Sequence, residues 1–257
     1  MDLGLSDKVF LVTAASSGLG LASARQLVAE GARVVLVARR ADVLAQVADE
    51  LNQDAEQDAP RAVPMAGDLA EPETVTEAIT VALENFGQVD GALVSVGGPP
   101  AGGVLEMTDE QWTAAFASVF LPPLRVARAV YAQNPTARLA LVLSTSARVP
   151  LPGMAISNGL RPGLAALVKQ LADEVGSDGG RAVGLMPGSV ATDRMTYLFS
   201  QSSDPRAARE LVESQVPLRR MGEPEEFAQV AAFVLSDAAS YMSGCLLGVD
   251  GGAMRAV

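Results

Sequence analysis

A glycine-containing turn near the start of the chain has the residue types needed to bind an anion. Residues 13–20 read Thr-Ala-Ala-Ser-Ser-Gly-Leu-Gly, after an apolar run and before a segment of helical period. Gly18 and Gly20 allow close approach to the backbone, and the N–H groups that begin a helix face an anion. This context favours a turn that binds a dinucleotide pyrophosphate over an ordinary tight turn. The residues predicted to make this contact are Thr13, Ala15, Ser16, Ser17, Gly18, Leu19 and Gly20.

Two adjacent arginines indicate which dinucleotide binds. After the second predicted strand, folds that bind NAD place an acidic residue against the ribose hydroxyls. This chain has Ala38 there, followed by Arg39 and Arg40. A guanidinium group binds a 2′-phosphate through charge-assisted hydrogen bonds, so we predict NADP(H) as the cofactor. The alternative is a solvated basic pair at a helix start, where cations are slightly unfavourable. Asp68 and Leu69, just past the third predicted strand, are candidates for the adenine end.

An alternation of strands and helices must position these residues. Short Val-, Leu- and Ala-rich runs alternate with segments of helical period, which is typical of βαβ units around a parallel sheet. We therefore predict a Rossmann-type, doubly wound α/β fold of about seven parallel strands with helices on both faces. Residues 1–257 would form one domain. The predicted strands are 9–13, 33–38, 61–65, 92–96, 139–143, 182–186 and 246–249. The predicted helices are 18–30, 41–52, 73–86, one from Thr108, one after Leu160, and 223–235.

Composition excludes several classes of function. Histidine is absent and Cys245 is the only cysteine. This excludes serine–histidine triads and His-based proton relays, and we expect no metal site. The net charge of −11 opposes binding to nucleic acid. No apolar stretch reaches the roughly 18 residues of a membrane span, and no signal peptide is evident, so we expect a cytoplasmic protein without a membrane partner.

Further segments extend the pattern along the chain. They are Pro187-Gly188 with Thr192-Asp193, residues 217–226, Ser243-Gly244 and residues 249–252. Together with residues 13–20, in which Ala14 replaces the first glycine of a TGxxxGxG turn, they resemble the short-chain dehydrogenase/reductase family. Within it the chain is similar to bacterial 3-oxoacyl-acyl-carrier-protein reductases. The resemblance implies that Pro187, Gly188 and Thr192 lie at the nicotinamide, with Thr192 on its carboxamide. It also implies a homo-oligomer, a tetramer or dimer, formed through the last helix and strand.

The catalytic positions depart from this family. Its tetrad is Asn, Ser, Tyr and Lys, and the matching positions here hold Val119, Ser144, Ser157 and Arg161. The residues 97–100, Gly-Gly-Pro-Pro, and the stretch 157–161, Ser-Asn-Gly-Leu-Arg, resemble a divergent branch of the family. The resemblance implies that the substitutions form a consistent set.

The substitutions change the expected chemistry. We predict Ser144, Ser157 and Arg161 as the catalytic residues, although the hydroxyl of Ser144 has an alternative role as a cap at the strand end. An aliphatic hydroxyl is a far weaker acid than tyrosine, so proton transfer should lose about a hundredfold or more. Arg161 can hold the nicotinamide ribose and polarise a carbonyl, but it cannot relay protons. Gly97 follows the fourth strand and should approach the nicotinamide.

Prolines and turn residues lead to three local predictions. Pro162 predicts that its helix begins later than usual, so that Asn158 points into the site in place of Ser157. Pro122 and Pro123 predict a break in the helix that carries Val119. The polar, turn-rich residues 197–205 predict a mobile flap.

Three functions are compatible with these residues. The first, which we favour, is an NADP(H)-dependent reductase of a small or acyl-linked ketone with an atypical proton donor. The second is a catalytically silent NADP(H)-binding sensor or scaffold, which the missing Tyr, Lys and Asn would explain. The third, dehydration or isomerisation, lacks an identifiable general base.

Overall fold

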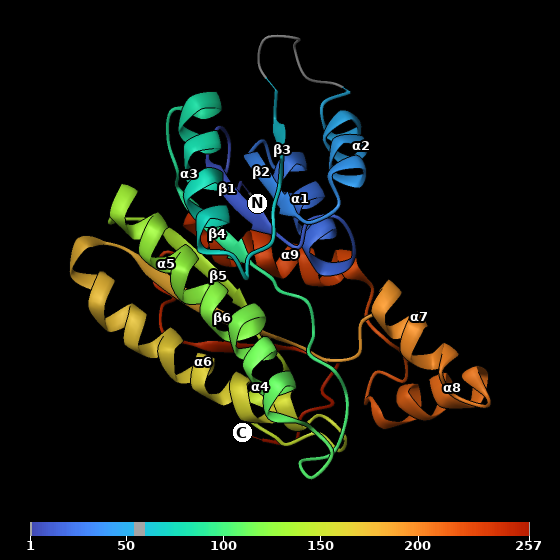
Figure 1. The fold of residues 1–257 in the computed structure, drawn as a ribbon. Coiled ribbons are helices and arrows are strands. Elements are labelled where there is room, and N and C mark those ends of the chain that lie inside the picture. Colours follow the sequence, from blue (N-terminus) through green and yellow to red (C-terminus); the bar gives the residue numbers. More distant parts are fainter. Residues whose placement is uncertain (1, 54–59, 257) are drawn as a thin grey trace.

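The computed structural model of the protein describes residues 2–53 and 60–256 and contains one parallel sheet (Figure 1). Its seven strands have the order β3-β2-β1-β4-β5-β6-β7, and every neighbouring pair is parallel. The strands are β1 (Val9–Thr13), β2 (Arg33–Ala38), β3 (Ala62–Ala66), β4 (Gly91–Val94), β5 (Arg138–Val142), β6 (Arg181–Pro187) and β7 (Leu246–Val249). The predicted Rossmann-type fold is confirmed, and each predicted strand lies within two residues of the observed one.

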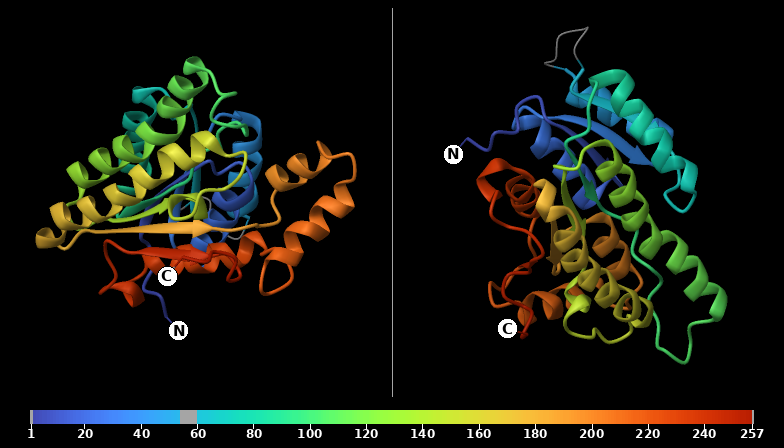
Figure 2. Two further views of the ribbon diagram at one scale, coloured as in Figure 1. Left: turned by 90° about the horizontal axis from the view of Figure 1, so that it is seen from below. Right: turned by 90° about the vertical axis from the view of Figure 1, so that its left-hand side faces the viewer.

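Helices cover both faces of the sheet. They are α1 (Gly18–Ala29), α2 (Ala41–Leu51), α3 (Pro72–Phe86), α4 (Asp109–Ala115), α5 (Leu121–Gln133), α6 (Ala155–Val175), α7 (Asp193–Ser200), α8 (Pro205–Gln215) and α9 (Pro224–Leu235). One core packs α1, α2 and α9 against side chains such as Phe10 and Leu36. The other core packs α3, α5 and α6 against side chains such as Leu11 and Val35, which are next to Phe10 and Leu36 in the sequence. Successive residues of a strand point to opposite faces of the sheet, so a continuously apolar strand contributes side chains to both cores. The helices lie on both faces (Figures 1 and 2).

The strand order sets where a ligand can bind. The chain fills the sheet outward from β1 to β3, then returns to place β4 on the other side of β1. In open α/β sheets the crevice at such a reversal, at the carboxyl ends of the strands, is the usual ligand site. The loops that leave β1, β4, β5 and β6 all open at this edge.

The helix α6 begins earlier than predicted. It starts at Ala155 and runs through Pro162 to Val175. The prediction of a later start was wrong because one lost backbone hydrogen bond is outweighed by packing. The side chains of Ile156, Leu164 and Val168 on this helix are fully buried.

Pro122 and Pro123 do not break the chain's helical path. They lie in the first residues of α5, directly after a wider helical turn in which the Leu121 N–H bonds to the Phe116 carbonyl, and this turn accommodates residues that lack an N–H. A π-helical turn, Phe116–Phe120, connects α4 directly to α5. The predicted break was therefore wrong, and the helical path continues through the extra residue of the π turn.

The residues 197–205 are not one loose segment: residues 197–200 and Pro205 are helical, and a turn at 201–204 joins the two helices, while the mobility of this segment stays a prediction. α7 extends to Ser200, and α8 begins at Pro205 with the Asp204 side chain accepting a hydrogen bond from the Ala207 N–H. Together α7 and α8 form a helical hairpin that projects from the body of the molecule at one side (Figures 1 and 2). Within the described residues, none of the helices combines the length and apolar character of a membrane span.

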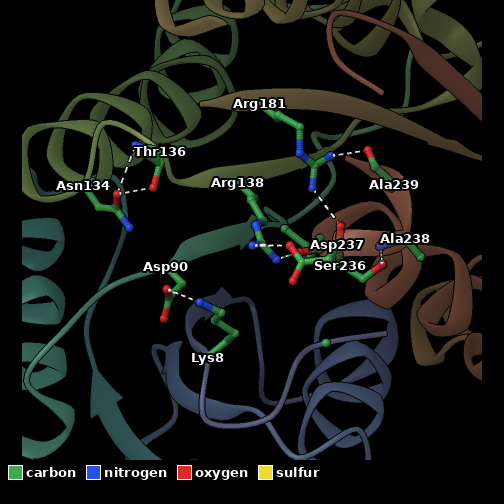
Figure 3. A network of polar contacts seen from close by, with 12 residues as sticks. Lys8, Asp90, Asn134, Thr136, Arg138, Arg181, Ser236, Asp237, Ala238 and Ala239 are labelled. Atoms are coloured by element: carbon green, nitrogen blue, oxygen red, sulfur yellow. Dashed lines mark hydrogen bonds and ion pairs between the residues drawn. The ribbon is translucent and has the colours of Figure 1, made fainter. Parts of the chain in front are cut away.

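A polar network holds the opposite edge of the sheet, at the amino ends of the strands (Figure 3). Arg138 begins β5 and pairs with Asp237 at 2.6 Å, and Lys8 pairs with Asp90 at 3.4 Å. Arg181, buried at the start of β6, donates hydrogen bonds to the carbonyls of Val234, Ser236, Ala239 and Met242. The network attaches the segment after α9 to the sheet, and it lies away from the crevice.

Candidate functional site

Two adjoining cavities lie along the carboxyl edge of the sheet. The first, here named the β2 cavity, has a volume of about 450 Å³ and lies beside Arg39, Arg40, Asp68 and Leu69. The second, here named the β5 cavity, has a volume of about 300 Å³ and reaches Ser144 and Arg161. The two share the wall residues Ala14, Ser17, Ser95, Val96, Gly97 and Gly98. They therefore lie next to each other across the point where the strand order reverses, and the two together are here named the channel.

The turn between β1 and α1 forms the floor of this channel. Its sharp bend places Ala14 in the left-handed region at φ 51° and Gly18 at φ 55°. A Cβ on Gly20 would lie 2.7 Å from the Thr13 carbonyl oxygen, so only glycine fits there. Ser17 precedes α1 without capping it through its side chain. The first N–H groups of α1 are therefore left for an anionic ligand.

Two of the predicted turn residues act from beneath the floor. Ala15 is fully buried in the core. Thr13 is also buried, and its hydroxyl donates to the Ser95 carbonyl and accepts from the Ser95 N–H at 2.8 Å. Neither is among the residues that line the cavities, whereas Ser16, Ser17, Gly18, Leu19 and Gly20 all are.

The arginine pair lies at the mouth of the β2 cavity. Both guanidinium groups belong to exposed residues that directly follow β2. Arg40 extends back over the turn and donates from Nη2 to the Ser16 hydroxyl at 3.1 Å. Asp68 and Leu69 line the same cavity, and Arg125 fixes their loop by donating to the Leu69 carbonyl at 3.1 Å. The structure thus brings together the two groups of residues that the sequence assigned to the 2′-phosphate and the adenine.

At its other end the channel is lined by Ser144, which lies two residues after the end of β5. Its hydroxyl oxygen accepts a hydrogen bond of 3.1 Å from the Ser146 N–H and so caps a short 3₁₀ turn. Because a serine hydroxyl can accept and donate at once, its proton stays available to a ligand in the β5 cavity. Pro187, Gly188 and Thr192 line the same cavity after β6. The Thr192 methyl group lies 3.5 Å from where a Cβ on Gly18 would be, so this loop contacts the start of α1.

Ser157 lies apart from the cavity. It is only 3% exposed, its hydroxyl is hydrogen-bonded to that of Ser146 at 2.8 Å, and it is not among the lining residues. Asn158 does not replace it, because the Asn158 amide donates to the Leu151 carbonyl at 2.8 Å and accepts from the Leu151 N–H at 2.9 Å. The prediction that Asn158 points into the site was wrong. The early start of α6 fixes this orientation.

Arg161 lines the β5 cavity from α6 and is 5% exposed. Its Nη1 donates to the Val142 carbonyl at 2.7 Å, while its Nε is buried with no hydrogen-bond partner in the described part of the chain. Burial, with a further contribution from the nearby charge of Arg194, lowers the pKa of Arg161 to about 10. The side chain therefore remains a cation at neutral pH.

Arg194, in the first turn of α7, is the cavity residue that sequence reasoning missed. It donates from Nη1 to the Gly98 carbonyl at 3.1 Å and from Nη2 to the Pro99 carbonyl at 3.0 Å. Its position directly after the Thr192-Asp193 pair could have identified it from the sequence as a residue near the site. Other lining residues outside the predicted site are Ser118, Met154 and Asp193. Val119, at the asparagine position of the tetrad, is buried in an apolar cluster with Ile156 and Leu160.

Comparison with known proteins gives consistent matches over the whole chain. A family model described as enoyl-(acyl carrier protein) reductase matches residues 13–254. The chain is 31% identical to the versicolorin reductase of Emericella nidulans, covering 98% of this chain and 97% of that protein. It is 28% identical to the 3-oxoacyl-[acyl-carrier-protein] reductase of Thermotoga maritima, covering 96% and 98%.

Solved structures agree with these matches. The crystal structure of L-sorbose reductase from Gluconobacter frateurii, complexed with NADPH and L-sorbose, superposes with a TM-score of 0.94 at 29% identity and covers 100% of both chains. The residues that resemble the family thus belong to a full-length match in both sequence and fold. On this evidence the protein is a member of the short-chain dehydrogenase/reductase family, similar to its 3-oxoacyl-acyl-carrier-protein reductases.

Proposed function

We propose that the protein is an NADP(H)-dependent reductase that converts a ketone to an alcohol with an atypical proton donor. The observation that carries this proposal is the pair of adjacent cavities that extends from Arg39 and Arg40, over the start of α1, to Ser144 and Arg161. A channel of this kind matches an extended dinucleotide with a substrate at one end. The similar L-sorbose reductase was solved in complex with NADPH and L-sorbose, which supports an NADP(H)-dependent reductase here.

The residues present fit the dinucleotide along its length. The α1 amides and the close approach at Gly20 suit the pyrophosphate. Arg39 and Arg40 would hold the 2′-phosphate, with Asp68 and Leu69 at the adenine. The residues that would surround the nicotinamide are Gly97, Arg161, Pro187, Gly188 and Thr192. When bound, the cofactor supplies the hydride.

The protein's own part in the reaction is to bind and polarise the ketone. Ser144 would donate its hydroxyl proton to the carbonyl oxygen as the hydride arrives, the Ser146 N–H would stabilise the serine oxygen, and solvent would then return a proton to it. Arg161 adds a fixed positive charge at the wall of the β5 cavity, where charge developing on that oxygen is stabilised. Ser157 would act as a positioning residue through its bond to Ser146. The weak acidity of a serine predicts a slow proton step compared with a tyrosine donor.

A catalytically silent NADP(H)-binding protein is the second candidate. Two observations favour it: Val119 is apolar and buried, and the Ser157 hydroxyl is withdrawn from the cavity. Both lie at positions where the family has catalytic groups. This candidate predicts NADP⁺ and NADPH affinities that differ, without turnover.

One experiment separates the two candidates. The purified protein is incubated with NADPH and a panel of ketones, including 3-oxoacyl thioesters and ketoses, while absorbance at the nicotinamide band is followed. Steady oxidation that a Ser144→Ala plus Ser157→Ala variant abolishes supports the reductase. Calorimetric binding of NADPH without oxidation across the panel supports the silent protein.

We also propose that the protein forms a homo-oligomer, a tetramer or dimer, in the cytoplasm. The last strand, β7, supports an interface between copies of the chain, because it is an edge strand whose apolar residues Leu246, Leu247 and Val249 are only partly buried. Light scattering coupled to size exclusion tests the oligomeric state.

A further inference from the structure

We propose that the substrate is an oxo acid, whose carboxylate binds to Arg161 and Arg194 in the β5 cavity while its ketone meets Ser144. This inference rests on the proposed reductase function and names the class of its substrate.

Arg161 is a buried cation with unused hydrogen-bonding capacity. Only Nη1 has a hydrogen-bond partner in the described part of the chain, and Nε is both buried and unpaired. A charge taken out of water is destabilising unless an opposite charge compensates it. None of the ion pairs among the described residues includes Arg161. The missing partner is therefore an anion that the protein does not itself supply.

The buried Arg181 shows what a structural arginine looks like in this fold. It is 8% exposed, close to the 5% of Arg161, but its two terminal nitrogens donate to four backbone carbonyls. The carboxylate of Asp237 also offsets part of the effect of burial on its pKa. Arg161 has only one such hydrogen bond, to the Val142 carbonyl, and no carboxylate among the groups that shift its pKa, so the fold compensates its burial much less.

A second cation lines the same cavity. Arg194 reaches it from α7, and its charge contributes to the lowered pKa of Arg161. Two like charges brought together oppose each other unless an anion binds between them. Asp193 also lines the cavity, but none of the ion pairs in the described residues joins it to either arginine. The planar fork of a guanidinium matches the two oxygens of a carboxylate.

The anion belongs to the substrate because the cofactor's phosphates already have places elsewhere. The α1 start suits the pyrophosphate, and Arg39 and Arg40 lie at the far mouth of the channel. Arg161 lies at the β5 end with Ser144, where the ketone must be for its oxygen to receive a hydrogen bond. A carboxylate on the same molecule would thus be bound next to the reacting carbonyl.

The test uses matched pairs of ligands on the NADP⁺-saturated protein. Pyruvate, acetoacetate and levulinate are each titrated by calorimetry against their methyl esters, which keep the ketone and lose the charge. We expect at least one acid to bind about tenfold or more tighter than its ester. Arg161→Met and Arg194→Met should each remove that preference, and Arg161→Lys should restore only part of it.

Controls keep the outcomes distinct. Arg206→Met, on the exposed face of α8, should leave the preference unchanged. Circular dichroism checks that each variant folds. The inference is overturned if no acid is preferred over its ester, or if Arg161→Met and Arg194→Met both keep that preference once NADP⁺ is saturating, which would leave the two arginines to the cofactor and the fold. A wild-type protein that binds no dinucleotide would instead overturn the proposed function itself.

Discussion

Arg194 lies directly against the backbone of Gly98: its Nη1 donates to the Gly98 carbonyl at 3.1 Å, and a Cβ on Gly98 would lie 2.5 Å from its Cζ atom. The guanidinium therefore takes the space that any other residue at position 98 would need for its side chain. This contact joins the loop after β4 to α7, and both line the β5 cavity.

Replacing Gly98 by alanine should release α7 from that loop. The added methyl group must displace the Arg194 guanidinium and with it the hydrogen bonds to Gly98 and Pro99. Partly exposed charged hydrogen bonds contribute about 1 kcal/mol or more, so amides of α7 should exchange about tenfold faster. Hydrogen–deuterium exchange measures this directly. Gly97→Ala is the matched control, because a Cβ there meets nothing within 4 Å, and equal exchange in the two variants would contradict the contact.

The Arg39→Gln plus Arg40→Gln variant should lose its preference for NADP⁺ over NAD⁺. Two exposed charge-assisted contacts to a phosphate together account for roughly a 10- to 100-fold difference in affinity. NAD⁺ lacks that phosphate, so its affinity should barely change. Calorimetry with both dinucleotides, at low and high salt, is the measurement. An unchanged affinity for NADP⁺ would show that Arg39 and Arg40 are only a solvated basic pair at the start of α2.

Gly20→Ala should abolish dinucleotide binding. The new methyl group would lie 2.7 Å from the Thr13 carbonyl oxygen, and that turn cannot move without moving β1. We expect the affinity for NADP⁺ to fall by at least about a hundredfold, as two or more amide contacts are lost. Gly176→Ala serves as control, since its Cβ would have open space around it. If the Gly20→Ala variant keeps the full affinity for NADP⁺, the start of α1 does not bind the pyrophosphate.

Ser144→Ala should affect the rate more than Ser157→Ala does. Ser144 lines the cavity, and removing one donor to a developing oxyanion lowers kcat by about 100- to 1000-fold. Ser157 acts through Ser146, so its loss should lower kcat by about tenfold or less and reduce stability by about 1 kcal/mol. Steady-state kinetics and chemical denaturation separate the two effects. Equal losses of kcat would place both hydroxyls at the substrate.

The two buried arginines should respond oppositely to replacement by methionine. Arg181→Met leaves four carbonyls without their donor, so the free energy of unfolding should fall by about 3–5 kcal/mol. Arg161 is charged at neutral pH although its pKa falls from 12.5 to about 10 on burial, which destabilises the ligand-free fold by about 3 kcal/mol. Arg161→Met removes that effect and unpairs only the Val142 carbonyl. Its unfolding free energy should therefore match or exceed the wild type, as urea denaturation at neutral pH would reveal.

The sheet and the residues that line the β2 cavity could be predicted because local sequence patterns determine them. Continuous apolar runs marked the strands to within two residues, and the turn before α1 is itself a contiguous segment. The segments 97–100 and 157–161, which resemble one branch of the family, lie far apart in the sequence, and the structure places Gly97 and Arg161 on one cavity.

The shape of the β5 cavity depends on contacts between segments that are distant in the sequence, and the sequence alone does not reveal these contacts. Arg194 meets Gly98 across 96 positions of the chain. The directions of Ser157 and Asn158 depend on where α6 begins, and packing decided that start in spite of Pro162. Val119 was identified as apolar, but its place in a buried cluster required the structure.

The Thr13 hydroxyl, bonded to both the N–H and the carbonyl of Ser95, links the two walls of the channel through a single atom. A ligand that immobilises the turn above Thr13 therefore also immobilises the chain that leads to Gly97 and Gly98. We expect this linkage to impose an order of addition, in which the dinucleotide enters first and the ketone is received by an already rigid surface.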